Sequence, residues 1–175
     1  KTSEDFQKEF LLVWTTTPWT LTANTAVAVN PTMTYCKVKQ NDEFYYLAKS
    51  RLSILTDDYQ LVDKFPGKEL VGKIIDSPFN YLTAQKGITH KVVDWLDVSG
   101  DEGTGFVHIA PGCGAEDYEL SKNQNLKILS PIDEFGIFTS KYDEFNGLEV
   151  AKVSEKVKQI LAEKNLLYKS EKFSH

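Results

Sequence analysis

Apolar residues along the chain occur mostly in short runs that turn-forming residues separate. Such runs, rich in Val, Ile, Tyr and Phe, predict short strands at 10–14, 25–29, 35–38, 43–47, 61–65, 70–75 and 90–93. Asn30-Pro31, the turn at 40–42, Pro66-Gly67 and Gly87 mark the breaks between them. The closely spaced runs between 25 and 47 predict a meander of neighbouring strands.

Helical spacing is clearest near the C-terminal end. Val150, Val153, Val157, Ile160 and Leu161 recur on one face, opposite Lys and Glu residues, and predict an amphipathic helix. A shorter helix is expected at 115–123, weak helical spacing covers 50–58, and further short strands are expected at 127–129 and 136–138. Many short strands with few helices predict an α+β fold, a β-barrel-like core of short strands with a few peripheral helices.

Composition narrows the class of protein. A chain of 175 residues that is 41% hydrophobic can bury one core, so we expect a single domain over 1–175. A net charge of −5 disfavours binding along a long stretch of nucleic acid, because the phosphates are also negative, so any contact with nucleic acid should be local. Cys36 and Cys113 fit no CxxC pattern, which predicts neither a bound metal nor a disulfide. With no signal peptide or long apolar run, we expect a cytoplasmic protein without membrane contact, and a start at Lys1 suggests a fragment of a larger protein.

Candidate chemistry centres on the stretch 103–118. Gly103 and Gly105 predict a flexible segment that leads into a short strand ending at His108. A turn rich in Pro and Gly follows, and then a helix whose first turn contains Glu116 and Asp117. Such a reversal could bring His108 and Asp117 to the mouth of one pocket. The structural alternatives are a packed histidine and a carboxylate that stabilises the helix N-terminus.

A second stretch, 15–24, offers hydroxyl groups. Thr15, Thr16 and Thr17 precede Pro18, which favours extended backbone and could present hydroxyls at a strand end, although β-branched residues also simply fill strands.

Two further hypotheses have weaker support. Cys113 lacks a local base that would make it a nucleophile, and a zinc site from His90, His108, Cys113 and Asp117 matches no usual ligand spacing.

Taken together, the two stretches resemble the editing domain of isoleucyl-tRNA synthetase. The resemblance rests on the segment from Trp14 to Leu21 with Asn24, and on the segment from Gly103 to Tyr118. The sister valyl and leucyl enzymes carry similar stretches, but the Val107-His108 pair and the Gly-Ala-Glu-Asp run favour the isoleucyl type. The HIGH and KMSKS signatures of class I synthetases are absent from the sequence, so we expect aminoacylation to lie elsewhere in a larger enzyme. Cys113, where relatives often have histidine or an aromatic residue, and Thr22, where proline is usual, depart from the pattern.

The resemblance implies hydrolytic editing of valyl-tRNA(Ile), and leaves open whether valyl-adenylate is a second substrate. Isoleucine and valine differ by one methylene, so a binding pocket distinguishes them poorly and the enzyme attaches valine to tRNA(Ile) by mistake. A second site then hydrolyses the mischarged product, and isoleucyl-tRNA synthetase is itself the standard example of this problem. The implied catalytic residues are Asp117, which binds the substrate ammonium, and His108, which walls the side-chain pocket. The implied substrate-binding residues are Thr15, Thr16, Thr17, Trp19, Asn24 and Gly105.

No metal and no cofactor are implied, and the expected partners are the 3′ end of aminoacylated tRNA(Ile) and the remainder of the parent synthetase. Three alternatives stay open. The chain could be a non-catalytic module that binds a nucleotide or aminoacyl-adenosine group, a metal-dependent hydrolase, or the editing domain of a valyl or leucyl enzyme.

Overall fold

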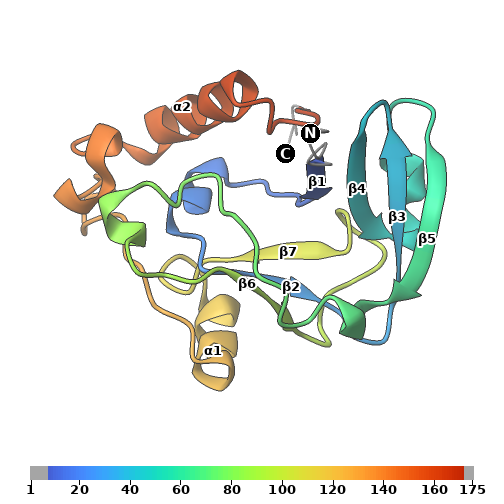
Figure 1. Ribbon diagram of the computed structural model, residues 1–175. Coiled ribbons are helices and arrows are strands. Elements are labelled where there is room, and N and C mark those ends of the chain that lie inside the picture. Colours follow the sequence, from blue (N-terminus) through green and yellow to red (C-terminus); the bar gives the residue numbers. More distant parts are fainter. Residues whose placement is uncertain (1–7, 172–175) are drawn as a thin grey trace, which may run out of the picture. The chain divides into compact units, whose positions relative to one another are not determined.

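The computed structural model describes residues 8–171 (Figure 1). These residues divide into two compact units. Unit 1 comprises the residues up to Thr15 together with Val27–Lys73 and Val92–Val107. Unit 2 comprises Thr16–Ala26, Ile74–Lys91 and the residues from His108 onward. The prediction of a single domain over 1–175 stays a prediction.

Unit 1 is built on a four-stranded sheet with the strand order β1-β4-β3-β5. The strands are β1 (Lys8–Leu11), β3 (Thr34–Gln40), β4 (Glu43–Ala48) and β5 (Gln60–Pro66). Strand β3 pairs antiparallel with both β4 and β5, and β1 pairs parallel with β4. The 3-10 helices η2 (Lys49–Ile54) and η3 (Gly67–Glu69) follow β4 and β5. Apolar side chains of β3 and β4, among them Tyr35, Val38 and Leu47, are fully buried and form the core of this unit.

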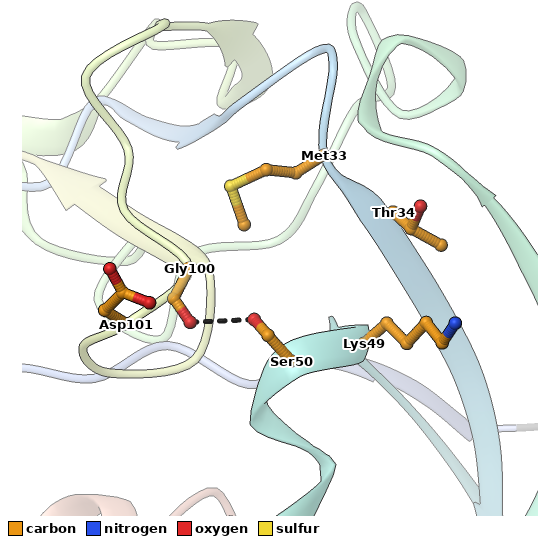
Figure 2. Close-up of a pocket in the computed structure, with 6 residues that line it drawn as sticks. All are labelled: Met33, Thr34, Lys49, Ser50, Gly100 and Asp101. Carbon is orange, nitrogen blue, oxygen red and sulfur yellow. Dashed lines mark hydrogen bonds between the residues drawn. The ribbon is translucent and has the colours of Figure 1, made fainter.

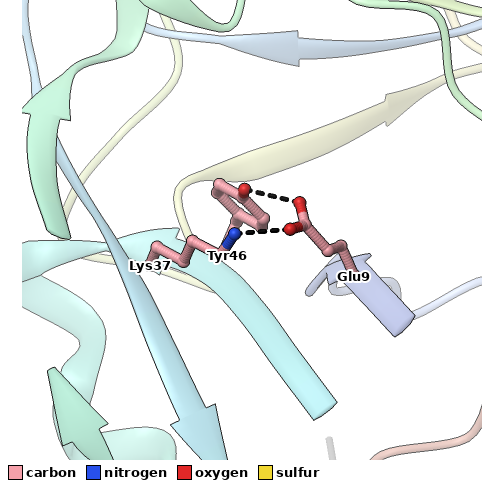
Figure 3. A network of polar contacts seen from close by, with 3 residues as sticks. All are labelled: Glu9, Lys37 and Tyr46. Carbon is pink, nitrogen blue, oxygen red and sulfur yellow. Dashed lines mark hydrogen bonds and ion pairs between the residues drawn. The ribbon is translucent and has the colours of Figure 1, made fainter. Parts of the chain in front are cut away.

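A polar network fixes β1 at the edge of this sheet (Figure 3). The Glu9 carboxylate accepts hydrogen bonds from the Lys37 amine and, at 2.7 Å, from the Tyr46 hydroxyl. The Lys37 amine also lies 4.5 Å from the centroid of the Phe44 ring. The network therefore joins one residue of β1 to both strands of the central hairpin.

A three-stranded sheet has the order β6-β2-β7. Its strands are β2 (Ala26–Val29), β6 (Lys91–Asp94) and β7 (Phe106–Ile109), and the division between the units falls within each of them. All four residues of β2 are buried, as expected for a central strand covered on both faces.

Unit 2 contains the helices α1 (Ala115–Gln124) and α2 (Val150–Glu163) and the 3-10 helices η1 (Pro18–Ala23), η4 (Thr83–Gln85) and η5 (Ser140–Phe145). Its apolar core consists of Phe79, Leu82, Phe138, Tyr142, Phe145, Val153, Val157 and Leu161. The last three come from α2 at helical spacing, so the predicted amphipathic helix is confirmed.

The α+β class is confirmed, but the described strands form two linear sheets and no closed barrel. The helix expected at 115–123 and most predicted strands are present, with boundaries shifted by a few residues. The strand expected at 70–75 is wrong. Gly72 has a φ of +85°, which interrupts extended backbone, and only Ile74 forms an isolated bridge, with Lys91.

The C-terminal half of the chain has fewer strands than predicted. Residues 127–129 form no strand, and Ile128 is 51% exposed, so this segment lacks the buried face that a sheet requires. Residues 136–138 contribute only isolated bridges, between Ile132 and Phe138 and between Ile137 and Glu149. The weak helical spacing at 50–58 corresponds to η2, which ends at Ile54.

Candidate functional site

The predicted reversal between His108 and Asp117 is present within unit 2. Strand β7 ends at Ile109, a turn covers 110–114, and α1 begins at Ala115. A Cβ at Gly112 would lie 1.8 Å from the Leu129 carbonyl oxygen, so only glycine fits this tight turn. The Cys113 amide closes the turn by donating to the Ala110 carbonyl at 2.9 Å.

Asp117 lies in the first turn of α1, and one of its carboxylate oxygens is already bound. Oδ2 accepts a hydrogen bond from the Ala110 amide at 2.8 Å, which ties the helix to the end of β7. Oδ1 accepts no hydrogen bond from any residue between 8 and 171. Burial raises the pKa of Asp117, and the Ala110 hydrogen bond opposes that rise. The neighbouring carboxylate of Glu116 is exposed, so Asp117 is the better placed of the two for a partly buried ligand.

His108 is held by a threonine that the sequence did not single out. Its Nε2 lies 2.8 Å from the Thr20 hydroxyl, which also donates to the Thr17 carbonyl at 2.8 Å. The hydroxyl has one hydrogen and the carbonyl can only accept, so His108 Nε2 must be the donor to Thr20. The proton on the neutral ring therefore sits on Nε2, and Nδ1 carries a lone pair.

Nδ1 of His108 is the chemically open atom of this pair. It is buried and has no hydrogen-bond partner within the described part of the chain. Burial lowers the pKa of His108 to about 4, so the ring is neutral at pH 7. His108 thus offers a buried hydrogen-bond acceptor beside an apolar strand, and can accept a hydrogen bond from water or a ligand N–H or O–H group.

The second half of the threonine-rich stretch forms a 3-10 helix, η1, that the sequence did not predict. The Thr20 and Thr22 hydroxyls donate to the carbonyls three residues earlier, those of Thr17 and Trp19, each at 2.8 Å. Thr20 and Thr22 are buried, whereas Thr16 and Thr17 are exposed. The spacing of three residues between Thr17 and Thr20 is the signal that could have revealed Thr20. Thr22, which replaces the usual proline, closes the last turn of η1 through its hydroxyl.

Two predicted substrate-binding residues have packing roles in unit 2. Asn24 is buried, and its side-chain amide donates to the carbonyls of Ala26 at 2.8 Å and Ile109 at 3.5 Å. Trp19 packs against the apolar core and meets Phe138 edge to face, with ring centroids 6.2 Å apart. Both residues anchor η1, whatever they contribute to binding.

The other two predicted binding residues, Thr15 and Gly105, belong to unit 1. Gly105 has a φ of +85°, and a Cβ there would lie 2.4 Å from the Cβ of Ala48. Its carbonyl accepts a hydrogen bond from the Tyr35 hydroxyl at 2.6 Å. Packing within unit 1 therefore requires glycine at this position independently of any ligand.

The cysteine and zinc hypotheses have no structural support. Burial raises the pKa of Cys113 to about 12, so the thiol stays protonated and is a poor nucleophile. Across residues 8–171, no three His, Cys, Asp or Glu side chains gather in a way that could hold a metal ion. No helix in the same range is both long and apolar enough to cross a membrane.

Unit 1 has an open pocket of about 510 Å³ (Figure 2). It is lined by Met33, Thr34, Lys49, Ser50, Gly100 and Asp101, and the Ser50 hydroxyl donates to the Gly100 carbonyl at 2.7 Å. Lys49 and Asp101 lie on opposite sides of Ser50, so their charges do not converge on one ligand position. The lining includes none of the predicted site residues.

Comparisons with known proteins point to the same family as the motifs. The chain is 38% identical over 98% of its length to isoleucine–tRNA ligase 2 of Bacillus cereus, and 37% identical over 97% to isoleucine–tRNA ligase of Clostridium acetobutylicum. It is 36% identical over 99% to isoleucine–tRNA ligase of Thermoplasma acidophilum. The chain spans only 17%, 16% and 17% of these three relatives. No protein-family model matches it.

Similar solved structures belong to leucyl-tRNA synthetases. GlLeuRS-CP1 has a TM-score of 0.78 at 18% identity, over 95% of this chain and 86% of that one. The editing domain of the P. knowlesi cytosolic leucyl-tRNA synthetase has a TM-score of 0.68 at 17% identity, over 91% and 83% of the two chains. At these identities the likeness establishes the fold.

Proposed function

We propose that this chain, homologous over 98% of its length to a segment of isoleucine–tRNA ligases, is the part of such an enzyme that hydrolyses mischarged valyl-tRNA(Ile). Its partners are then the 3′ end of the charged tRNA and the rest of the synthetase, and it acts in the cytoplasm, where charging takes place. The same site accepts valyl-adenylate, because that molecule also presents an ammonium and an adenosine.

The observation that carries this proposal is the state of Asp117. One carboxylate oxygen is fixed by the Ala110 amide at 2.8 Å, and the other accepts no hydrogen bond among the described residues. A fixed carboxylate with a free oxygen is suited to bind the ammonium of an esterified amino acid, because a charge-assisted hydrogen bond is strong where water is partly excluded. Exposed Thr16 and Thr17 offer polar groups to the terminal adenosine.

The chemistry needs no protein nucleophile. An aminoacyl ester is already reactive, so a water molecule positioned near its carbonyl carbon can attack and form a tetrahedral intermediate. That intermediate collapses by breaking its bond to the ribose oxygen, which takes up the proton that the attacking water gives up, and free valine is released. The protein contributes orientation through Asp117 and a boundary to the side-chain pocket through His108.

The first test measures hydrolysis of valyl-tRNA(Ile) by the protein, with and without a chelator. We expect hydrolysis that exceeds the rate with isoleucyl-tRNA(Ile) and that the chelator does not change. Binding without hydrolysis would favour the non-catalytic module, and loss of activity with chelator would favour a metal-dependent hydrolase. Faster hydrolysis of mischarged tRNA(Val) or tRNA(Leu) would identify a sister enzyme.

The second test addresses the boundary at His108. Truncation in His108→Ala makes room for one more methylene, so we expect isoleucyl-tRNA(Ile) to become a substrate while valyl-tRNA hydrolysis falls less than the selectivity. A methylene in an apolar pocket is worth about 1–3 kcal/mol, so the ratio of the two rates should change by roughly 5- to 150-fold. Unchanged rejection of isoleucine would return His108 to a purely structural role.

A further inference from the structure

Two buried side chains outside the predicted site, those of Gln85 and His90, form hydrogen bonds to the end of η1. Gln85, the last residue of η4, donates through its amide nitrogen to the carbonyls of Thr22 at 2.7 Å and Asn24 at 3.1 Å. The Nε2 atom of His90, just before β6, lies 3.0 Å from the Asn24 carbonyl and 2.9 Å from Gln85 Oε1. Only 2% of Gln85 and 4% of His90 are exposed.

The hydrogen bonds of this cluster fix which ring nitrogen of His90 carries the proton. The Asn24 carbonyl oxygen and Gln85 Oε1 can only accept hydrogen bonds, so Nε2 of His90 must carry the ring proton. The Gln85 amide uses both hydrogens on the two backbone carbonyls, and the Asn24 carbonyl uses both lone pairs. Burial also lowers the pKa of His90, which favours the neutral ring.

The segment that Gln85 and His90 bind, residues 20–25, also holds His108 in place. Within η1, Thr20 accepts a hydrogen bond from His108 Nε2 at 2.8 Å. After η1, the Thr25 amide donates to the Ile109 carbonyl at 2.8 Å, and the Asn24 side chain reaches the same carbonyl at 3.5 Å. The two ends of the segment 20–25 therefore contact His108 and its neighbour, and Gln85 and His90 bind backbone carbonyls within the segment.

We propose that Gln85 and His90 are positioning residues, which hold η1 where Thr20 orients the His108 ring for editing. Neither residue bears on the reacting groups directly, since both act through the backbone of Thr22 and Asn24. The consequence for catalysis rests on the proposed function, whereas the orientation of the His108 ring does not.

The test uses Gln85→Met, which keeps the side-chain length and removes both donated hydrogen bonds. In the free protein, NMR should show the His108 Nε2 proton exchanging with solvent at least roughly tenfold faster, because the opening of η1 exposes it. In deacylation of valyl-tRNA(Ile), kcat should fall by up to about 100-fold with KM little changed, because the ring is misplaced while the tRNA contacts persist. Gln159→Met is the matched control, since Gln159 is exposed on α2 and, among residues 8–171, its side chain bonds only to Glu163.

His90 provides a milder series. His90→Gln keeps an amide donor for the Asn24 carbonyl and should preserve both readouts, whereas His90→Met removes one of the two donors and should weaken both. This series decides the question if Gln85→Met does not fold. Wild-type proton exchange and kcat in a folded Gln85→Met or His90→Met would overturn the proposal, as would equal effects of Gln and Met at position 90. If the wild-type protein hydrolyses no valyl-tRNA, the proposed function fails and the proton exchange alone decides the positioning role.

Discussion

Asp117 combines a structural bond and a free oxygen, and the two roles can be separated by substitution. Asp117→Asn keeps an oxygen that accepts from the Ala110 amide but removes the charge, so the reversal should persist while ammonium binding is lost. Removing one partner of a desolvated charge pair costs about 2–5 kcal/mol, so valyl-tRNA deacylation should fall by roughly 30-fold to a few thousand-fold.

The control for that substitution is Glu116→Gln, the same change at the exposed neighbouring residue. It should leave deacylation nearly unchanged, and thermal unfolding should show both variants folded. Near-normal activity in Asp117→Asn, or equal losses in the two variants, would remove Asp117 from the site.

Thr20 orients His108 through one hydroxyl group, and this contribution is also measurable as stability. Thr20→Val keeps the shape but leaves His108 Nε2–H without its acceptor, at a cost of about 1–3 kcal/mol. At roughly 2–4 °C per kcal/mol for a chain of this size, the melting temperature should drop by about 2–12 °C. Thr20→Ser retains the hydroxyl and should lose much less, and equal losses in the two variants would show that the methyl group matters instead.

At the scale of elements, the segment of unit 1 that contains Gly105 is fixed by close packing. Gly105 and Gly72 both have a φ of +85°, but only at Gly105 would a Cβ collide with a neighbour, the Ala48 side chain. Gly72→Ala therefore carries the conformational penalty alone, whereas Gly105→Ala adds overpacking of about 1–3 kcal/mol. We expect urea unfolding to show that difference between the variants, and similar stabilities would mean that the segment can shift to accept a side chain.

Two of the correctly predicted elements, α2 and β2, bury the apolar residues that identified them. Val153, Val157 and Leu161 bury one face of α2, and the continuous apolar run of β2 is buried along its length. The stretch at 70–75 looked equally apolar, but the left-handed backbone of Gly72 ends any strand there. A single residue's conformation outweighed the local pattern.

The 3-10 helix η1 was not predicted, because part of its support comes from residues distant in the sequence. Threonines have low helical propensity, and the segment is held by side chains that are distant in sequence, Gln85 and His108. The same applies to the site. The reversal from His108 to Asp117 could be predicted from one continuous stretch, whereas the partner of His108, Thr20, is 88 residues away in the sequence.

At the scale of the whole molecule, the net charge bears on how nucleic acid can bind, and the buried histidines make the stability depend on pH. The net charge of −5 opposes extended contact with phosphates, which agrees with a proposed ligand that enters only by its 3′ end. A site that relies on neutral histidines also depends on pH. His90 and His108 both have a lowered pKa because of burial, so folding favours their uncharged rings.

The sign of the resulting pH dependence follows from the protons that each state binds. His108 titrates at about 4 when folded and at its ordinary value of 6.5 when unfolded, so the unfolded chain binds more protons between these values. The free energy of unfolding should therefore rise with pH from about 4 to 6.5, and His108 contributes at most about 3 kcal/mol to this rise.

Urea unfolding of the wild type and of His108→Gln at several pH values isolates that contribution. Glutamine does not titrate, so the variant should show a shallower rise between pH 4 and 6.5 and no added difference above it. Parallel curves for the two proteins would mean that His108 can take up a proton in the folded state at its ordinary pKa. The buried, unpaired Nδ1 would then have to be open to water, and His108 could not act as the neutral, fixed boundary of the side-chain pocket.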